Sequence, residues 1–168
     1  MPRLRQEDTG GITENRIDDA GRITLTADQR QSFPDGEVHL MLWLVDGCLR
    51  LCTEERRREL EELVEREWLK RPLLDLARRQ TVGTTRIVTI DEAGRIRIPY
   101  MYLDFIGLDG HGKKAWLIPL QEGIYELWNP DHFKRQMEQK LYDLVSVAAT
   151  RPGGSCASPT PDGESGDD

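Results

Sequence analysis

The sequence predicts an α+β protein made of two pseudo-symmetric halves, each with four strands followed by a helix. Three observations lead to this prediction. The segment IDDAGRI at 17–23 recurs as IDEAGRI at 90–96, and the two copies differ in only one acidic residue. Each copy precedes a pair of apolar segments that are joined by a glycine-containing turn. Each half then ends in a segment of helical periodicity.

The first two strands of each half are expected to form a hairpin around the repeated segment. In the returning strand, apolar residues alternate with polar ones, as in a strand with one buried face. We expect the leading and returning strands at 12–17 and 22–26 in the first half, and at 85–90 and 95–99 in the second.

A second hairpin follows in each half, with the turn Asp46-Gly47 in the first and Glu122-Gly123 in the second. The repeated segments lie 73 positions apart (18 to 91), whereas these turns lie 76 apart (46 to 122). We therefore expect three extra residues in the second half, within 107–114. The strands are expected at 37–45 and 48–52, and at 113–120 and 124–128.

A helix is expected to close each half. Thr53 is a suitable N-cap for a helix over 54–69, and Asn129 followed by Pro130 suits the start of the second helix. Pro72 interrupts the first helix and leaves 73–80 for one or two further turns. Apolar stripes run along both helices: Leu60, Leu63, Val64 and Trp68 in the first, and Phe133, Met137, Leu141, Leu144 and Ala148 in the second.

This organisation places the first half at 12–80 and the second at 81–150. The flanking residues have little to bury, so we expect 1–11 and the acidic tail at 151–168 to be disordered. No apolar run approaches the roughly 18 residues that span a membrane, which favours a protein of the cytoplasm without a membrane partner. The three cysteines are not at zinc spacing, so we expect buried thiols, no metal and no cofactor.

The net charge of −7 argues mildly against a nucleic-acid partner, because such partners usually select a basic surface. The charge is spread unevenly. Residues 151–168 hold one arginine against four acidic residues and contribute −3, so the other 150 residues carry only −4. Because local fields matter more than the total, this objection is weakened but not removed.

The repeated turn contains residues that a tight turn needs and one that it does not. Asp18 and Asp91 can accept hydrogen bonds from the backbone N–H groups ahead of them, and the glycine suits a positive φ. A turn does not require Arg22 or Arg95. Strand alternation places each arginine opposite a buried isoleucine, where the aspartate can hold it in a bidentate pair and orient it toward a phosphate or a guanine edge. The same faces carry Thr24 and Arg97.

These residues resemble a known family. Two Asp-x-x-x-Arg turns in tandem copies of D-x-x-G-R-[IV], and the segment ELWNPDHF that enters the last helix, are similar to the MraZ family of bacterial transcriptional regulators. The resemblance covers about residues 12–140. It implies the AbrB-like (SpoVT/AbrB) fold, in which two hairpin units interlock into a swapped-hairpin, double-psi-like β-barrel with flanking helices. It also implies a homo-oligomer, expected to be a ring.

The resemblance implies a regulator that binds repeated promoter boxes of a division and cell-wall operon in double-stranded DNA, at the nucleoid. Three features depart from the family pattern. Thr26 stands where the family usually has a proline, as Pro99 does in the second copy, the segment TADQRQSFPDGE at 26–37 is more polar than a typical first-half continuation, and the acidic tail is extra. The candidate DNA-binding residues are Asp18, Arg22, Thr24, Asp91, Arg95 and Arg97.

Two alternatives stay open. An AbrB-like oligomer could hold a protein partner without reading DNA, as some antitoxins of this fold do, and the acidic balance favours this a little. An enzyme is less well supported, because the three histidines, at 39, 111 and 132, lack a nucleophile signature or a second ligand at metal spacing. Turn chemistry also explains Asp18 and Asp91 more simply than an acid–base pair. We expect no catalytic residue.

Overall fold

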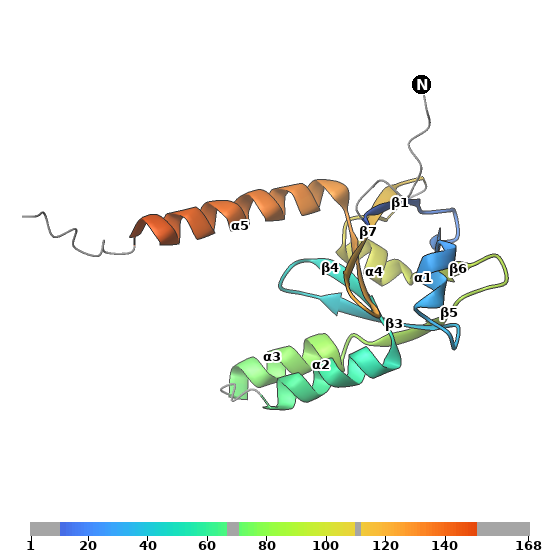
Figure 1. Ribbon diagram of the computed structural model, residues 1–168, viewed down its shortest axis with the longest axis horizontal. Coiled ribbons are helices and arrows are strands. Elements are labelled where there is room, and N and C mark those ends of the chain that lie inside the picture. Colours follow the sequence, from blue (N-terminus) through green and yellow to red (C-terminus); the bar gives the residue numbers. More distant parts are fainter. Residues whose placement is uncertain (1–10, 67–70, 110–111, 151–168) are drawn as a thin grey trace, which may run out of the picture.

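The computed structural model describes residues 11–66, 71–109 and 112–150. Within these ranges the protein is a mixed α+β structure, and each half contains the order β-β-α-β-β (Figure 1). The first half has β1 (Thr13–Arg16), β2 (Arg22–Thr24), α1 (Ala27–Gln31), β3 (Glu37–Trp43), β4 (Cys48–Cys52), α2 (Glu54–Arg66) and α3 (Arg71–Thr81). The second half has β5 (Arg86–Thr89), β6 (Arg95–Arg97), α4 (Tyr100–Phe105), β7 (Lys114–Gln121), β8 (Ile124–Trp128) and α5 (Pro130–Thr150). The expected disordered segments lie outside the described residues, apart from Gly11.

The strand pairs are all antiparallel, and they interlock the two halves. Six strands form one sheet in the order β1-β7-β8-β4-β3-β5, while β2 and β6 form a separate two-stranded ribbon. The first strand of each half pairs with the third strand of the other half: β1 with β7, and β5 with β3. Each half therefore completes its sheet with strands from the other.

A pseudo-two-fold axis relates the halves. Ile23 pairs with Ile96 in the ribbon, and Arg50 pairs with Glu126 where β4 meets β8. Each residue thus faces its own counterpart in the other half, which places the axis between the members of both pairs.

The structure adds two short helices to the expected order of four strands and a helix in each half. In α1, Thr26 and Gln29 form a capping box: the Thr26 hydroxyl accepts from the Gln29 N–H at 3.2 Å, and the Gln29 side chain accepts from the Thr26 N–H at 2.9 Å. The second helix, α4, follows Pro99, whose φ of −57° suits a helix start. Helices of five or six residues are too short to show a clear apolar period.

The extra residues of the second half lie where the sequence predicts, but they number four. Ile87 pairs with His39, and Glu14, the first-half residue equivalent to Ile87, pairs with Trp116. His39 and Trp116 are therefore equivalent residues, which sets β3 and β7 77 positions apart in the sequence. The spacing between equivalent residues falls to 76 at the β4–β8 pair.

The helix α3 is also longer than the expected one or two turns, with 11 residues.

The sheet is not closed into a barrel. Strands β1 and β5 are its two edges, and the ribbon is a separate sheet. The α+β class predicted from the sequence is confirmed at this level. A closed barrel is not formed by the hydrogen-bonded strands of the described residues.

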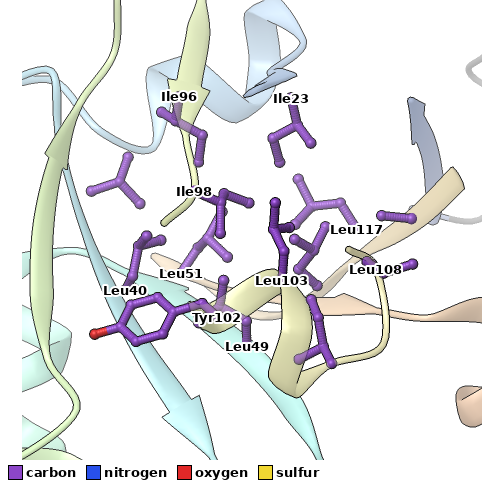
Figure 2. Packing of buried hydrophobic residues seen from close by; sticks show 14 of the residues in the cluster. Ile23, Leu40, Leu49, Leu51, Ile96, Ile98, Tyr102, Leu103, Leu108 and Leu117 are labelled. Carbon is purple, nitrogen blue, oxygen red and sulfur yellow. The ribbon is translucent and has the colours of Figure 1, made fainter. Parts of the chain in front are cut away.

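The core lies between the sheet, the ribbon and α4, and it fixes the ribbon in place (Figure 2). Ile23 and Ile96 reach into it from the ribbon and are 0% exposed. Leu40 and Leu51 meet them from the sheet, and Leu103 from α4. Because these side chains are buried, the opposite face of the ribbon must face outward.

The helices after the two halves differ in their packing. Helix α2 lies beside α3, which is joined to it by two hydrogen bonds from Arg78 to Glu65, at 2.9 and 3.0 Å. Helix α5 projects from the sheet as a single helix (Figure 1), and its apolar stripe is only partly buried, because Leu141 and Leu144 are 63% and 67% exposed. None of the described helices is long and apolar enough to cross a membrane.

The cysteines within the described residues behave as predicted. Cys48 and Cys52 are free and 0% exposed. Burial is the main cause that raises the pKa of the Cys52 thiol to about 12, and it also raises the pKa of Cys48. Both side chains are therefore neutral thiols that contribute to packing.

The two residues that meet on the axis between β4 and β8 carry opposite charges. Arg50 lies 3.3 Å from Glu126, and the two side chains are 12% and 11% exposed. The Arg50 guanidinium also stacks on Trp43, 3.4 Å from the ring centroid, and Trp128 donates its indole N–H to Glu126 at 2.9 Å. This nearly buried network joins the halves at their central strand pair.

Replacement of Glu126 by alanine is expected to lower the free energy of unfolding by about 3 kcal/mol, because the Arg50 guanidinium and the Trp128 N–H lose a buried partner. The double variant Arg50→Met, Glu126→Met should lose less, since neither charge is left unpaired. Urea unfolding followed by circular dichroism measures both values. An equal loss in the two variants would contradict this account of the pair.

Candidate functional site

The turn at 18–22 is closed by its own aspartate. Asp18 donates its N–H to the Arg22 carbonyl at 3.0 Å, and Gly21 donates to the Asp18 carbonyl at 3.0 Å. One carboxylate oxygen of Asp18, Oδ1, accepts from the N–H groups of Ala20 at 2.9 Å and Arg22 at 2.8 Å. Gly21 has a φ of 73°, a left-handed conformation that glycine adopts without strain.

The turn at 91–95 repeats this arrangement. The two backbone hydrogen bonds between Asp91 and the residues Arg95 and Gly94 are both 2.9 Å long. Asp91 Oδ1 accepts from Ala93 at 3.0 Å and from Arg95 at 2.9 Å, and Gly94 has a φ of 75°. The sequence repeat is therefore a repeat of local structure.

The second carboxylate oxygen of each aspartate holds the arginine. Arg22 donates its Nε–H to Asp18 Oδ2 at 2.7 Å, and Arg95 donates its Nε–H to Asp91 Oδ2 at 2.9 Å. This is a single contact and not the expected bidentate pair, because Oδ1 is already used by the backbone. The terminal Nη groups therefore remain available, and both arginine side chains are 34% exposed.

Hydrogen bonds to the carboxylates lower the pKa of both aspartates. For Asp18 and for Asp91 the largest cause is the backbone N–H of the arginine four residues ahead, followed among the favourable contacts by the arginine side chain. Each carboxylate is thus kept ionised, and each can hold its guanidinium at neutral pH.

The ribbon brings the two turns together on one surface. Arg22 lies opposite Arg97 across the ribbon, and Thr24 lies opposite Arg95. These four residues alternate with the buried isoleucines and therefore share the outer face of the ribbon. The other two candidate residues, Asp18 and Asp91, lie in the turns that lead into the ribbon. Arg22 and Arg95 are two strand positions apart in register, or about 7 Å along the ribbon.

Each turn is also tied to the half to which it does not belong. The Gly94 carbonyl accepts from the Leu25 N–H at 2.9 Å, and the Gly21 carbonyl accepts from the Ile98 N–H at 2.9 Å. Leu25 and Ile98 are 2% and 1% exposed. The turns are therefore anchored to the core through the strand ends, which limits their independent movement.

Arg30 is a further basic residue at the second turn that the sequence did not predict. A Cβ added at Gly94 would overlap the Arg30 guanidinium, so this side chain lies directly over the turn glycine. Arg30 is exposed, and no acidic side chain among the described residues pairs with it. It belongs to α1, which buried Gln29 fixes by donating to Thr13 at 2.8 Å. Recognition of the Thr26–Gln29 capping box would have been the signal for this helix.

The two turns have different neighbours despite their identical backbones. The counterpart of Arg30 at the first turn is Leu103, which is 4% exposed and lies against Gly21. Conversely, Arg22 of the first turn has Arg97 opposite it across the ribbon, whereas Arg95 of the second turn has Thr24 in the equivalent position. Each turn therefore has a second arginine supplied by the other half, but from non-equivalent positions.

The remaining candidates from the sequence do not form a catalytic or metal-binding group within the described ranges. His39 is buried in β3, whereas His132 at the start of α5 bonds to the Asp46 carbonyl at 2.9 Å. His111 lies outside the described residues. No set of three or more His, Cys, Asp or Glu side chains lies close enough to hold a metal ion in the part of the chain that is described.

Fold and site together define a class of protein: a small α+β protein with two interlocked, pseudo-symmetric halves that present a pair of braced arginine turns on one surface. The chain is 27% identical over 138 residues to the transcriptional regulator MraZ of Thermomicrobium roseum (strain ATCC 27502 / DSM 5159 / P-2), which covers 82% of this chain and 93% of that protein. No protein-family profile matches the chain. The protein is therefore similar to a transcriptional regulator over most of its length.

The carboxyl carbons of Asp18 and Asp91 are expected to titrate below the ordinary range of an aspartate in an NMR pH titration. Because the folded-state pKa is depressed, the contribution of each turn to stability is complete above the unfolded-state pKa and is lost as pH falls through the folded-state pKa. In Arg22→Ala the midpoint of Asp18 should rise but stay depressed, since the backbone N–H donors remain. Asp91 is the internal control, and an ordinary midpoint for Asp18 in the unmodified protein would contradict the geometry.

Proposed function

We propose that this protein is a sequence-specific transcriptional regulator that binds double-stranded promoter DNA through Asp18, Arg22, Asp91 and Arg95. The observation that carries the proposal is the duplicated brace, in which each aspartate holds its arginine by Nε while the arginine side chain stays one-third exposed. A preoriented guanidinium suits a phosphate or the O6 and N7 atoms of guanine. The similarity to a MraZ transcriptional regulator supports this assignment.

The spacing of the arginines suits one groove of a duplex. They lie about 7 Å apart along the ribbon, and the major groove of B-DNA is about 12 Å wide, which admits a two-stranded ribbon. Thr24 and Arg97 lie on the same outer face and join the contact. Both turns of one chain can therefore contact the same groove.

The second arginines make the two contacts chemically different. Arg97 assists Arg22 at the first turn, whereas Arg30 assists Arg95 at the second. A symmetric pair of turns would favour a palindromic site for each chain, but these different neighbours favour a site with a direction. We infer that each chain reads a non-palindromic box and that Arg30 is part of the contact.

The finer features implied by the family resemblance complete the proposal. The interlocked halves correspond to the AbrB-like swapped-hairpin arrangement without a closed barrel, and the chains assemble into a ring that presents the turns to repeated boxes of a division and cell-wall operon at the nucleoid in the cytoplasm. Repeated subunits strengthen weak contacts through effective concentration. Arginines gathered on one rim also make that surface locally positive, although the whole chain carries −7.

A second candidate function is an oligomeric, antitoxin-like protein that binds a protein partner without contacting DNA. The net charge and the exposed apolar side chains of α5, such as Leu141 and Leu144, favour it. The two functions differ in whether the unmodified protein binds DNA at all.

A salt-titrated anisotropy measurement with a duplex from upstream of the protein's own gene tests the proposal. The variant Arg22→Ala, Arg95→Ala is expected to lose about 1–3 kcal/mol per arginine if each contacts a base edge. If the arginines contact phosphates, the slope of log affinity against log salt should become shallower by about 0.9 for each.

The matched control is Arg66→Ala, Arg79→Ala, which removes two exposed arginines from α2 and α3. It should retain the affinity of the unmodified protein. Tight binding by the turn variant would exclude the turns, and a complete lack of binding by the unmodified protein would support the second candidate.

Arg30→Gln is expected to weaken binding by about tenfold, a typical effect of one lost guanidinium contact, with little change in thermal stability because the side chain is exposed. Its effect should be non-additive with Arg95→Ala, whose side chain shares the second turn, and additive with Arg22→Ala. The same titrations on the double variants measure the coupling. Equal coupling to both arginines would contradict the placement of Arg30 at the second turn.

A further inference from the structure

A wide cleft lies between α1, the start of α2 and the β7–β8 turn, with a volume of about 950 Å³. Acidic side chains dominate its wall. Glu54, Glu59 and Glu62 are paired with arginines of the same helix. Five further carboxylates have no basic side chain within ion-pair distance among the described residues: Asp28, Asp35, Glu37, Glu55 and Glu122. We call this region the acidic cleft.

A buried histidine in the wall of the acidic cleft lacks hydrogen-bond partners. His39 is 3% exposed, and neither of its ring nitrogens has a partner within the described structure. Its pKa is lowered, first by burial and then by the charge of Arg57, so the ring is neutral and offers one acceptor nitrogen. The acidic cleft therefore carries negative charge that no basic side chain of the described residues neutralises, which suits a cationic group of a partner.

The equivalent place in the second half has the opposite chemistry. Strand register equates His39 with Trp116, whose ring meets Phe133 edge-on at a centroid distance of 5.8 Å. On α5, Lys134 lies 5.4 Å from the Trp116 ring, and neither Lys134 nor Arg135 forms an ion pair with a described residue.

By the same pseudo-symmetry, exposed apolar side chains of α4 are equivalent to residues of α1 that line the acidic cleft. Met101 and Phe105 are 72% and 43% exposed, and they occupy the positions that Asp28 and Ser32 occupy in the first half. Asn129 joins the end of α4 to the start of α5 by donating to the Gly107 carbonyl at 3.2 Å. Met101, Phe105, Lys134 and Arg135 together are called the basic face.

We propose that the acidic cleft of one chain receives the basic face of a second copy of the same chain. The inference rests on the oligomer of the proposed function and assigns surfaces to it. Ammonium and guanidinium groups of the basic face meet the unpaired carboxylates, and Met101 and Phe105 meet the exposed Pro34 of the cleft wall.

The pseudo-two-fold axis determines the kind of assembly that results. It places the acidic cleft and the basic face on opposite sides of the chain, so the contact joins two different surfaces and leaves one of each free. Such a head-to-tail contact repeats from chain to chain, and it gives a ring where the rotation between neighbouring chains closes. The alternative occupant, the exposed stripe of α5 from a second copy, would give a closed dimer that does not depend on these charges.

Charge reversal tests the proposal. One variant carries Lys134→Glu and Arg135→Glu, and the other carries Glu55→Lys and Glu122→Lys; all four positions are exposed. Light scattering coupled to gel filtration is expected to show an oligomer for the unmodified protein and a monomer for each variant. An equimolar mixture of the two variants should recover the oligomer, because both of its contacts again join opposite charges.

Control variants separate specific docking from a general effect of charge. Arg79→Glu and Asp143→Lys reverse charges on α3 and on the distal part of α5, and both should assemble like the unmodified protein. Circular dichroism melts verify that the variants are folded. An unmodified protein that is monomeric, variants that assemble normally, or a mixture that stays monomeric would each overturn the proposal.

DNA binding distinguishes this inference from the proposed function. The monomeric variants keep both arginine turns, so they should bind a duplex containing one box within a few fold of the unmodified protein and lose the avidity for a duplex with several boxes. Assembly that is unaffected, together with a loss of binding in the turn variant, would reject the docking surfaces and retain the regulator.

Discussion

In each turn, one aspartate carboxylate has two roles, and these roles determine the proposed binding surface. In each turn, Oδ1 of the aspartate closes the backbone and Oδ2 holds the arginine. The same side chain therefore sets both the shape of the turn and the position of its guanidinium. Local backbone geometry and the presentation of charge cannot vary independently, which explains why the turn and its arginine occur together in both halves.

The two short strands that carry these turns would be unstable as an isolated ribbon. They are held by Ile23 and Ile96, which are fully buried, and by the hydrogen bonds that link each turn glycine to the other half. The rigid part of the proposed surface is therefore a consequence of packing beneath it. The variable part consists of neighbours such as Arg30 and Leu103, which have diverged although the backbone has not.

The sequence predicts local structure well where a short motif is repeated or where a turn or cap residue is distinctive. The glycine turns, the alternation around Ile23 and Ile96 and the N-cap at Thr53 predict the main strands and the start of α2 correctly. These patterns do not predict the strand pairing between the halves, because that pairing depends on contacts far apart in the sequence. Only the family resemblance implies it. The sequence does not predict the position of Arg30 for a related reason, since its place at the second turn follows from the docking of a five-residue helix onto the other half.

The exchange of strands between the halves also bears on the integrity of the chain. Strands β1 and β5 are each paired with the opposite half, and the backbone at 82–85, between α3 and β5, connects one half to the next, with Thr84 accepting hydrogen bonds from the Leu42 N–H and the Tyr102 hydroxyl. A protease that cuts this connection would not release a folded fragment, because each piece lacks the partner strands that complete its sheet. The two pieces would instead remain associated as a nicked protein, and half-length polypeptides produced separately should be able to reconstitute the fold.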